Sequence, residues 1–255
     1  MITEPLFYVV AIPAIILTGL AKGGFLSGLG GLAVPLMALV ISPIQAAGIM
    51  LPILIVMDLI GVVNYRKEFD RANVVTLLPA AIVGVAAGYL LASHVSEAQV
   101  RLLVGLIGFA FALDYFLKSA QTRARPRPPN TLLGRFWGFI AGFTSFISHT
   151  GAPPFQIYML PQRLPNAVLA ATAIVFFATI NWIKVVPYAA LGQFTSTNLW
   201  TAACLLPLAP LSIGAGIWLT RNTAPGPFYT LTYASLLIIS VKLIYDGAAV
   251  SLFAQ

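Results

Sequence analysis

The chain has 255 residues, of which 59% are hydrophobic and only 8% are charged, and its formal net charge is +7. Because a soluble domain is about 25% charged, this composition excludes a water-soluble globule. We therefore interpret the excess of basic residues as a sign of membrane topology rather than of nucleic-acid binding. The apolar runs have the length of membrane helices and lack the alternation of barrel strands, so we predict an all-α polytopic membrane protein.

Ten helices are expected from the apolar runs. In chain order they span 6–21, 26–42, 44–65, 73–93, 101–118, 135–149, 152–160, 166–189, 198–220 and 227–246. The segments 26–42 and 152–160, with their partners 6–21 and 135–149, are short or interrupted by glycine and proline. We therefore expect two broken or re-entrant helix pairs, each followed by three transmembrane helices.

The distribution of basic residues predicts the orientation of the chain. The longest polar connection, "KSAQTRARPRPPNTLLGR" (118–135), has five basic residues and no acidic one, which places it in the cytoplasm. With that loop fixed, the external loops contain only Arg101, whereas the cytoplasmic loops contain ten basic residues. These ten are Arg66, Lys67, Arg71, Lys118, Arg123, Arg125, Arg127, Arg135, Arg163 and Arg221. The bias predicts a multi-pass protein of the cytoplasmic (inner) membrane with both termini outside.

The two halves of the chain resemble each other. The stretch "GLAKGGFLSGLGGLAVP" (19–35) aligns without gaps to "GFIAGFTSFISHTGAPP" (138–154), and "DLIGVVNY" (58–65) aligns to "NWIKVVPY" (181–188). We predict a first repeat over 1–118, a basic cytoplasmic linker over 119–134 and a second repeat over 135–255. The repeats enter the membrane from opposite sides, and such inverted repeats with broken segments are typical of secondary transporters. The alternative is a duplication that serves packing alone, with its small residues allowing close helix contact.

Charged residues within the apolar segments are the first candidates for a site. Each costs at least ~2.5 kcal/mol to place in lipid, so each needs a partner or a function. Asp58 lies about 12 Å from its helix end at ~1.5 Å per residue, and its repeat counterpart is Asn181, with Lys184 one turn away. In a functional interpretation, Lys184 or Lys22 faces a substrate, and Asp58 tunes the charge of that lysine or carries a proton. In a structural interpretation, Asp58 and Lys184 form an ion pair that joins the two halves.

The second broken segment, "TSFISHTGAPP" (144–154), gathers hydroxyls and one imidazole. Such a segment either lines a cavity or bonds to its own backbone and packs. Helix N-termini and lysines attract anions, whereas a cation site would need more carboxylates, so we expect an anion and no metal. The candidate substrate-binding residues are Lys22, Gly23, Gly24, Ser27, Gly28, Ser145, Ser148, His149, Thr150, Asn181 and Lys184, and the candidates for coupling or charge tuning are Asp58 and His149.

A longer stretch, "GLAKGGFLSGLGGLAVPLMALVISPIQAAGIMLP" (19–52), resembles the opening motif of the TauE/SafE family. The motif is a glycine-rich segment, a proline, a short loop and an alanine-rich helix start, and a weaker second copy follows Gly138. The resemblance covers about 6–246. It implies export of a small sulfur-containing anion, such as sulfite, sulfoacetate or another organosulfonate, across the cytoplasmic membrane. The sequence has no ATP-binding motif, so the membrane potential or a proton would drive transport.

We therefore expect a secondary transporter that works by alternating access around a site between the two broken segments. The alternatives are a passive channel or carrier for another small anion, such as a carboxylate, and, more remotely, an intramembrane hydrolase using Ser148 or Ser145 with His149. No G-x-S-x-G elbow supports the hydrolase, so we expect no enzyme. The expected partners are a small anionic substrate and membrane lipid, with a homodimer as an open alternative and with no nucleic acid or cofactor.

Overall fold

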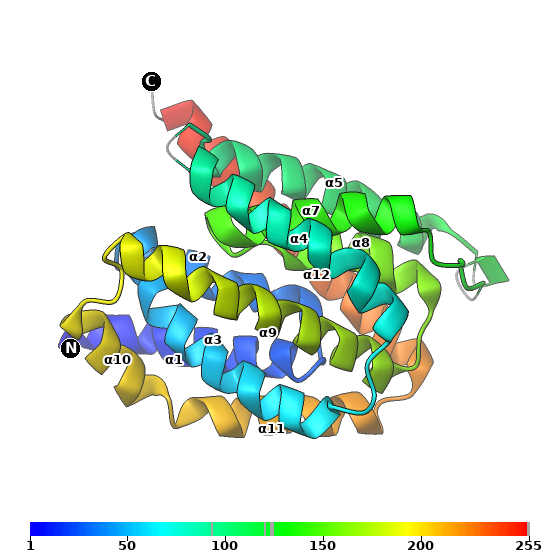
Figure 1. The fold of residues 1–255 in the computed structure, drawn as a ribbon, viewed down its shortest axis with the longest axis horizontal. Coiled ribbons are helices and arrows are strands. Elements are labelled where there is room, and N and C mark those ends of the chain that lie inside the picture. The colour runs from blue at the N-terminus through cyan, green and yellow to red at the C-terminus, as the bar shows by residue number, and fades with distance from the viewer. Residues whose placement is uncertain (93, 120, 123–124, 254–255) are drawn as a thin grey trace. The chain divides into compact units, whose positions relative to one another are not determined.

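The structure is a computed structural model that describes residues 1–92, 94–119, 121–122 and 125–253 (Figure 1). The surroundings of Gly28 and the side chains of 250–253 lie outside this description. Within the described ranges every regular element is a helix. These are α1 (Pro5–Lys22), η1 (Ser27–Leu32), α2 (Ala33–Met37), α3 (Pro43–Tyr65), α4 (Arg71–Leu91), α5 (Glu97–Leu117), α7 (Thr131–Ser148), α8 (Ala152–Met159), η2 (Leu160–Gln162), α9 (Asn166–Ala190), α10 (Ser196–Leu205), α11 (Leu208–Asn222) and α12 (Pro225–Phe253).

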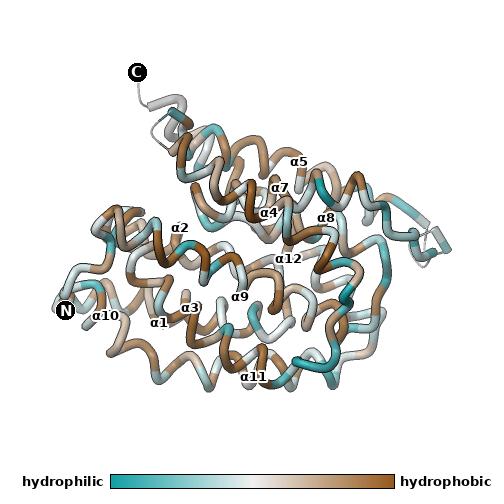
Figure 2. Tube along the Cα trace, in the orientation of Figure 1, coloured by the Kyte–Doolittle hydropathy of each residue, from teal (hydrophilic) through white to brown (hydrophobic). Residues whose placement is uncertain are grey.

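Six of the described helices are long and apolar enough to cross a membrane: α1, α3, α4, α5, α9 and α12. The pair α10 and α11 passes the same test together and gives a seventh candidate span. In Figure 2 the apolar colour follows the helices, and polar residues gather in connections such as the one between α5 and α7. The prediction of an all-α, multi-pass membrane protein is thus confirmed.

The prediction of one continuous helix over 198–220 is wrong. Helix α10 ends at Leu205, α11 begins at Leu208, and the two are bent by 49°. Pro207 lies at the break, as the N-cap of α11. Proline lacks the N–H of a helical hydrogen bond, and its ring clashes with the preceding turn, so it weakens a helix at this position, and here the helix breaks.

The first glycine-rich segment is broken, as its composition predicts. After α1 the chain continues as η1, a short 3₁₀ helix, and then as α2, which has only five residues. The backbone between α1 and η1 is left-handed at Gly24, with φ of 98°, and at Leu26, with φ of 55°. A glycine adopts this conformation without strain, which explains why the break begins where it does.

The described chain divides into two compact units. Unit 1 comprises Met1–Phe69 and Asn166–Thr223, where α1 packs against α11 and α3 packs against α9. Its helices approach closely at glycines: a Cβ atom built on Gly23 would lie 2.5 Å from the backbone of Gly216. Small residues permit this kind of contact between membrane helices.

Unit 2 comprises Asp70–Pro165 and Ala224–Gln255, where α4 packs against α7 and α5 packs against α12. A Cβ atom on Gly142 would lie 2.0 Å from the carbonyl oxygen of Ala81, so α4 and α7 also meet at small residues. Two hydrogen bonds between the buried amides of Asn73 and Gln162, of 2.8 and 3.1 Å, join the start of α4 to η2.

Each half of the sequence contributes to both units. Unit 1 takes the elements α1 to α3 from the segment 1–118 and α9 to α11 from the segment 135–255. The linker 119–134 belongs to unit 2, and its residues 120 and 123–124 lie outside the described ranges. The compact units are therefore a different division of the chain from the predicted repeats.

The close glycine contacts generate a prediction about stability. Gly142→Ala adds a methyl group against the backbone of α4, so we expect the melting temperature in detergent to fall. Gly214→Ala is the matched control, because nothing lies within 4 Å of the added Cβ on this exposed glycine of α11. There the gain in helix propensity, about 1 kcal/mol, should leave the melting temperature unchanged or raised. Equal shifts for both variants would contradict the close approach of α4 and α7.

Candidate functional site

Three helices of unit 1 meet at the carboxylate of Asp58 in α3. Its Oδ1 accepts a hydrogen bond of 2.5 Å from Nζ of Lys22, the last residue of α1. Its Oδ2 accepts one of 2.6 Å from Nδ2 of Asn181 in α9. Both carboxylate oxygens are therefore engaged, one by a charged donor from the first half of the chain and one by an amide from the second half.

Burial makes this contact energetically important. The side chain of Asp58 is 0% exposed and that of Lys22 is 14% exposed. Removing one partner of a buried ion pair typically costs ~3–5 kcal/mol, because the other charge remains buried without compensation. The three side chains thus link α1, α3 and α9 at one buried point.

A second amine joins this group from α9. Lys184 is one turn beyond Asn181 and 1% exposed, and it lies close enough to Lys22 and Asp58 to interact electrostatically with both. The ring of Phe177 lies 5.7 Å from Nζ of Lys22, at cation–π distance. Phe177, Asn181 and Lys184 follow a helical spacing of four and three, so they share one face of α9. We call Lys22, Asp58, Asn181 and Lys184 the lysine–aspartate cluster.

The end of α1 is fixed by contacts to its backbone. The carbonyl oxygen of Gly23 accepts hydrogen bonds of 3.0 Å from the hydroxyls of Tyr65 and Thr220. A Cβ atom on Gly24 would lie 2.3 Å from Cβ of Ala170. The candidates Gly23 and Gly24 therefore sit in tight packing that positions the adjacent Lys22. Ser27 begins η1 and is half-buried.

The candidates from the second broken segment lie in unit 2, at the end of α7. The hydroxyls of Ser148 and Thr150 are 2.6 Å apart, and the hydroxyl of Thr144 donates to the carbonyl oxygens of Ile140 and Thr150. Ser145 is buried as well. His149 follows α7 as its C-cap with φ of 55°. The described contacts show the hydroxyls of Thr144, Ser148 and Thr150 bonding to one another and to the backbone at the end of α7.

Sequence reasoning missed several residues of the site. It considered a structural pair of Asp58 with Lys184, but it did not pair Asp58 with Lys22, which precedes Asp58 by 36 residues and donates a hydrogen bond to it. It also missed Phe177 and Thr220. Tyr65 could have been found, because it ends the aligned stretch "DLIGVVNY" and lies seven residues after Asp58, on the same helix face.

The chemistry of the cluster favours an anion over a metal. Two amines and an amide donate, and the one carboxylate already accepts from two of them. Among the residues that the structure describes, no three His, Cys, Asp or Glu side chains are placed to hold a metal ion. The amines could instead meet a small oxyanion, which accepts hydrogen bonds at each oxygen.

Comparison with known protein families gives a match over most of the chain. The model described as "Sulfite exporter TauE/SafE" matches residues 11–243, a range that includes the whole lysine–aspartate cluster. Comparison with curated proteins and with solved structures gives no match. Since the family match runs through both units and nearly the whole length of the chain, the protein belongs to the TauE/SafE family of multi-pass membrane transporters.

Proposed function

We propose that the protein is a secondary transporter that exports a small sulfur-containing anion, such as sulfite or an organosulfonate, across the cytoplasmic membrane. The observation that carries the proposal is the buried lysine–aspartate cluster in a chain of this family. The cluster is rich in donors, and buried ionisable groups within membrane spans usually mark a transport pathway. A negative-inside potential would favour efflux by about 2.3 kcal/mol for each net negative charge moved per 100 mV, so an anion that leaves together with a proton gains less of this drive.

The carboxylate of Asp58 provides a switch for anion binding. While it is ionised it occupies Nζ of Lys22, so a substrate anion competes with it for the same donor. A proton on Asp58 would remove that competition and leave Lys22 to bind the anion. Proton uptake and anion binding would then be linked at one residue, which is the coupling role we assign to Asp58.

Alternating access is the transport mode we propose, with two inverted repeats as its structural basis. In the proposed repeats, α7 is the equivalent of α1, and α4 is the equivalent of α11. Helix α1 packs against α11 in unit 1, and α7 packs against α4 in unit 2. The equivalent helices α3 and α9 pair with each other, as do α5 and α12. Such reciprocal contacts are what two copies related by a two-fold axis produce, and they support the proposal of inverted repeats.

The second half supplies Asn181 and Lys184 to the cluster. We also propose the hydroxyl-rich segment of unit 2, with Ser145, Ser148, His149 and Thr150, as a separate set of substrate contacts. Gly23 and Gly24 serve by positioning Lys22, and Ser27, at the start of η1, is a further proposed substrate contact. The proposed orientation retains the basic linker in the cytoplasm and both termini outside, since the basic residues of the loops are concentrated on one side.

Removing Lys22 separates a functional role from a structural one. Lys22→Met should lower the melting temperature, because Asp58 loses its hydrogen-bonded cation and keeps only the amide of Asn181 and the nearby amine of Lys184. The double variant Lys22→Met with Asp58→Asn removes both members of this ion pair but leaves Lys184 buried, so we expect it to recover at most part of that stability. Sulfite efflux from proteoliposomes should be lost in both, because neither retains the amine of Lys22.

The control for this series is the ion pair between Lys242 and Asp246 in α12, with its 2.5 Å contact. Lys242→Met with Asp246→Asn should retain sulfite efflux near the wild-type rate. Restored efflux in the double variant of Lys22 and Asp58 would show that the cluster is only structural, and it would overturn the proposed site.

Proton coupling predicts a specific defect for Asp58→Asn. The wild-type protein should move protons together with a sulfonate, a substrate chosen because its own charge is fixed. The Asn variant should carry the sulfonate without protons or fail to carry it, because an amide side chain does not take up and release a proton as a carboxylate does. A pH-sensitive dye trapped in the vesicles reports the proton movement. Proton movement at the wild-type ratio in Asp58→Asn would assign the coupling to another group, such as His149.

Ligand stabilisation tests the substrate class directly. Sulfite and sulfonates should raise the melting temperature of the purified protein, and Lys22→Met should abolish the shift. A lost hydrogen bond to a charged group is worth ~1.5–3 kcal/mol, roughly tenfold to hundredfold in affinity. Stabilisation by carboxylates but not by sulfite or sulfonates would favour a carboxylate carrier instead.

A further inference from the structure

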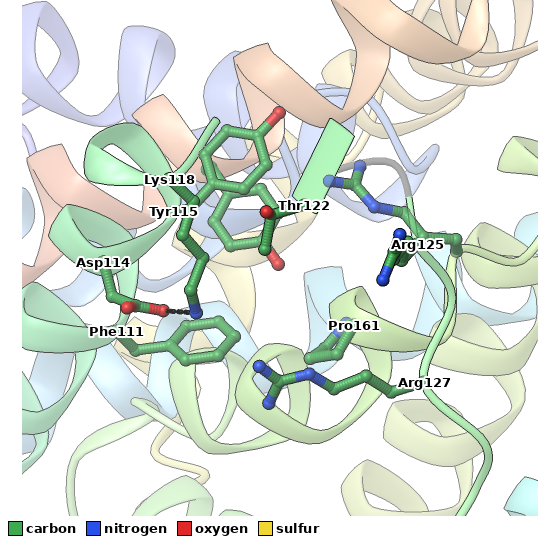
Figure 3. A pocket seen from close by; sticks show the side chains of 10 residues that line it. Phe111, Asp114, Tyr115, Lys118, Thr122, Arg125, Arg127 and Pro161 are labelled. Carbon is green, nitrogen blue, oxygen red and sulfur yellow. Dashed lines mark hydrogen bonds and ion pairs between the residues drawn. The ribbon is translucent and has the colours of Figure 1, made fainter. Parts of the chain in front are cut away.

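A basic pocket lies in unit 2, outside the lysine–aspartate cluster. It is an open pocket with a volume of about 170 Å³, lined by the end of α5, the linker, the connection before α9 and the helix α12. Its lining contains the cations Lys118, Arg125, Arg127 and Arg163 and the carboxylate of Asp114, which pairs with Lys118. Figure 3 shows Lys118 and Asp114 joined on one wall, with Arg125 and Arg127 across the pocket. The pocket thus has four cations and one anion.

An aromatic wall fixes Arg163 at this pocket. The rings of Tyr115 and Tyr233 stack with their centroids 3.7 Å apart and their planes within 2°. The guanidinium of Arg163 lies 4.4 Å from the ring of Tyr229, 5.3 Å from that of Tyr115 and 5.8 Å from that of Tyr233. Cation–π contacts leave the N–H donors of a guanidinium available at its edge. Arg163 is therefore held in place with donors still able to bind an anion.

Arg127 is positioned by the backbone rather than by a carboxylate. The main-chain N–H of Arg127 donates a hydrogen bond of 2.9 Å to the carbonyl oxygen of Pro161, which lies two residues before Arg163. In the part of the chain that the structure describes, neither Arg125 nor Arg127 forms an ion pair. The linker thus brings the guanidinium groups of two arginines to a pocket that already contains Arg163. These like charges repel one another, and a bound anion would relieve that repulsion.

The geometry points to a phosphate group as the ligand of this pocket, and we propose the headgroup of an anionic phospholipid as its favoured source. Guanidinium groups match phosphate oxygens with paired N–H donors. The volume has room for one such group and for waters, each of which needs only ~10–15 Å³ of such space. Basic pockets at the cytoplasmic ends of membrane helices recognise anionic headgroups, and tyrosine is enriched at that depth. The lipid source relies on the cytoplasmic placement of the linker proposed above.

The alternative is that these residues are solvated loop charges that only determine the orientation of the chain across the membrane. Loop charges of that kind need no defined geometry. The stacked tyrosines and the tether from Arg127 to Pro161 instead hold the cations around one cavity. A site with defined geometry should saturate and should depend on particular arginines, which gives the test.

The test uses the full chain in a neutral detergent, titrated with phosphatidylglycerol, phosphatidylcholine or inorganic phosphate. Phosphatidylglycerol should raise the melting temperature and saturate, and phosphatidylcholine should not. Arg127→Gln should weaken the apparent affinity about tenfold or more, the effect of one charge-assisted contact. Arg125→Gln is the second variant, because both side chains are exposed and their loss leaves the aromatic wall intact.

Arg135→Gln is the matched control. This residue has the same charge, is exposed, and lies on the proposed cytoplasmic side but outside the pocket lining. Equal weakening by Arg127→Gln and Arg135→Gln would overturn the site in favour of general surface charge. Saturation by inorganic phosphate alone would retain the phosphate chemistry and overturn the lipid source. Stabilisation by none of the three, or an arginine-dependent response to sulfite and not to phosphate, would overturn the proposal, while the tests of the lysine–aspartate cluster stay independent of it.

Discussion

The buried carboxylate of Asp58 is the constraint on which the arrangement of unit 1 depends. Both of its oxygens are taken, by the amine of Lys22 and by the amide of Asn181, so three helices must keep their positions for the charge to remain compensated. Hydrogen bonds from Tyr65 and Thr220 to Gly23 fix the end of α1 beside it. In the proposed mechanism, protonation of Asp58 frees Lys22 for a substrate, and this step links anion binding to a proton.

The exchange of helices between the two halves explains why the cluster combines residues so distant in sequence. Each unit draws α-helices from both halves, so Asp58 from the first half meets Asn181 from the second. Close glycine contacts make these pairings possible, at Gly23 with Gly216 in one unit and at Gly142 with Ala81 in the other. The same exchange brings Arg163 to tyrosines of α5 and α12 in unit 2, where the charges form a pocket.

Hydropathy alone predicted most helices to within a few residues, because long apolar runs in lipid have few structural options. Pro207 alone did not predict the break between α10 and α11, because Pro52 and Pro79 lie inside continuous helices of the same chain. Asp58 was recognisable as a candidate because a charge within a span is costly. Its pairing with Lys22 was not recognisable, since that contact depends on how α1 crosses α3, and a single sequence carries no signal for that crossing. The aromatic partners of Arg163 were hidden for the same reason.

A structure of the protein at saturating sulfite, in an environment acidic enough to protonate Asp58, tests the central claim most directly. We predict the anion within hydrogen-bonding distance of Nζ of Lys22, with the contact between Lys22 and Asp58 broken. An intact contact between Lys22 and Asp58, with the anion bound elsewhere in the protein, would contradict the account.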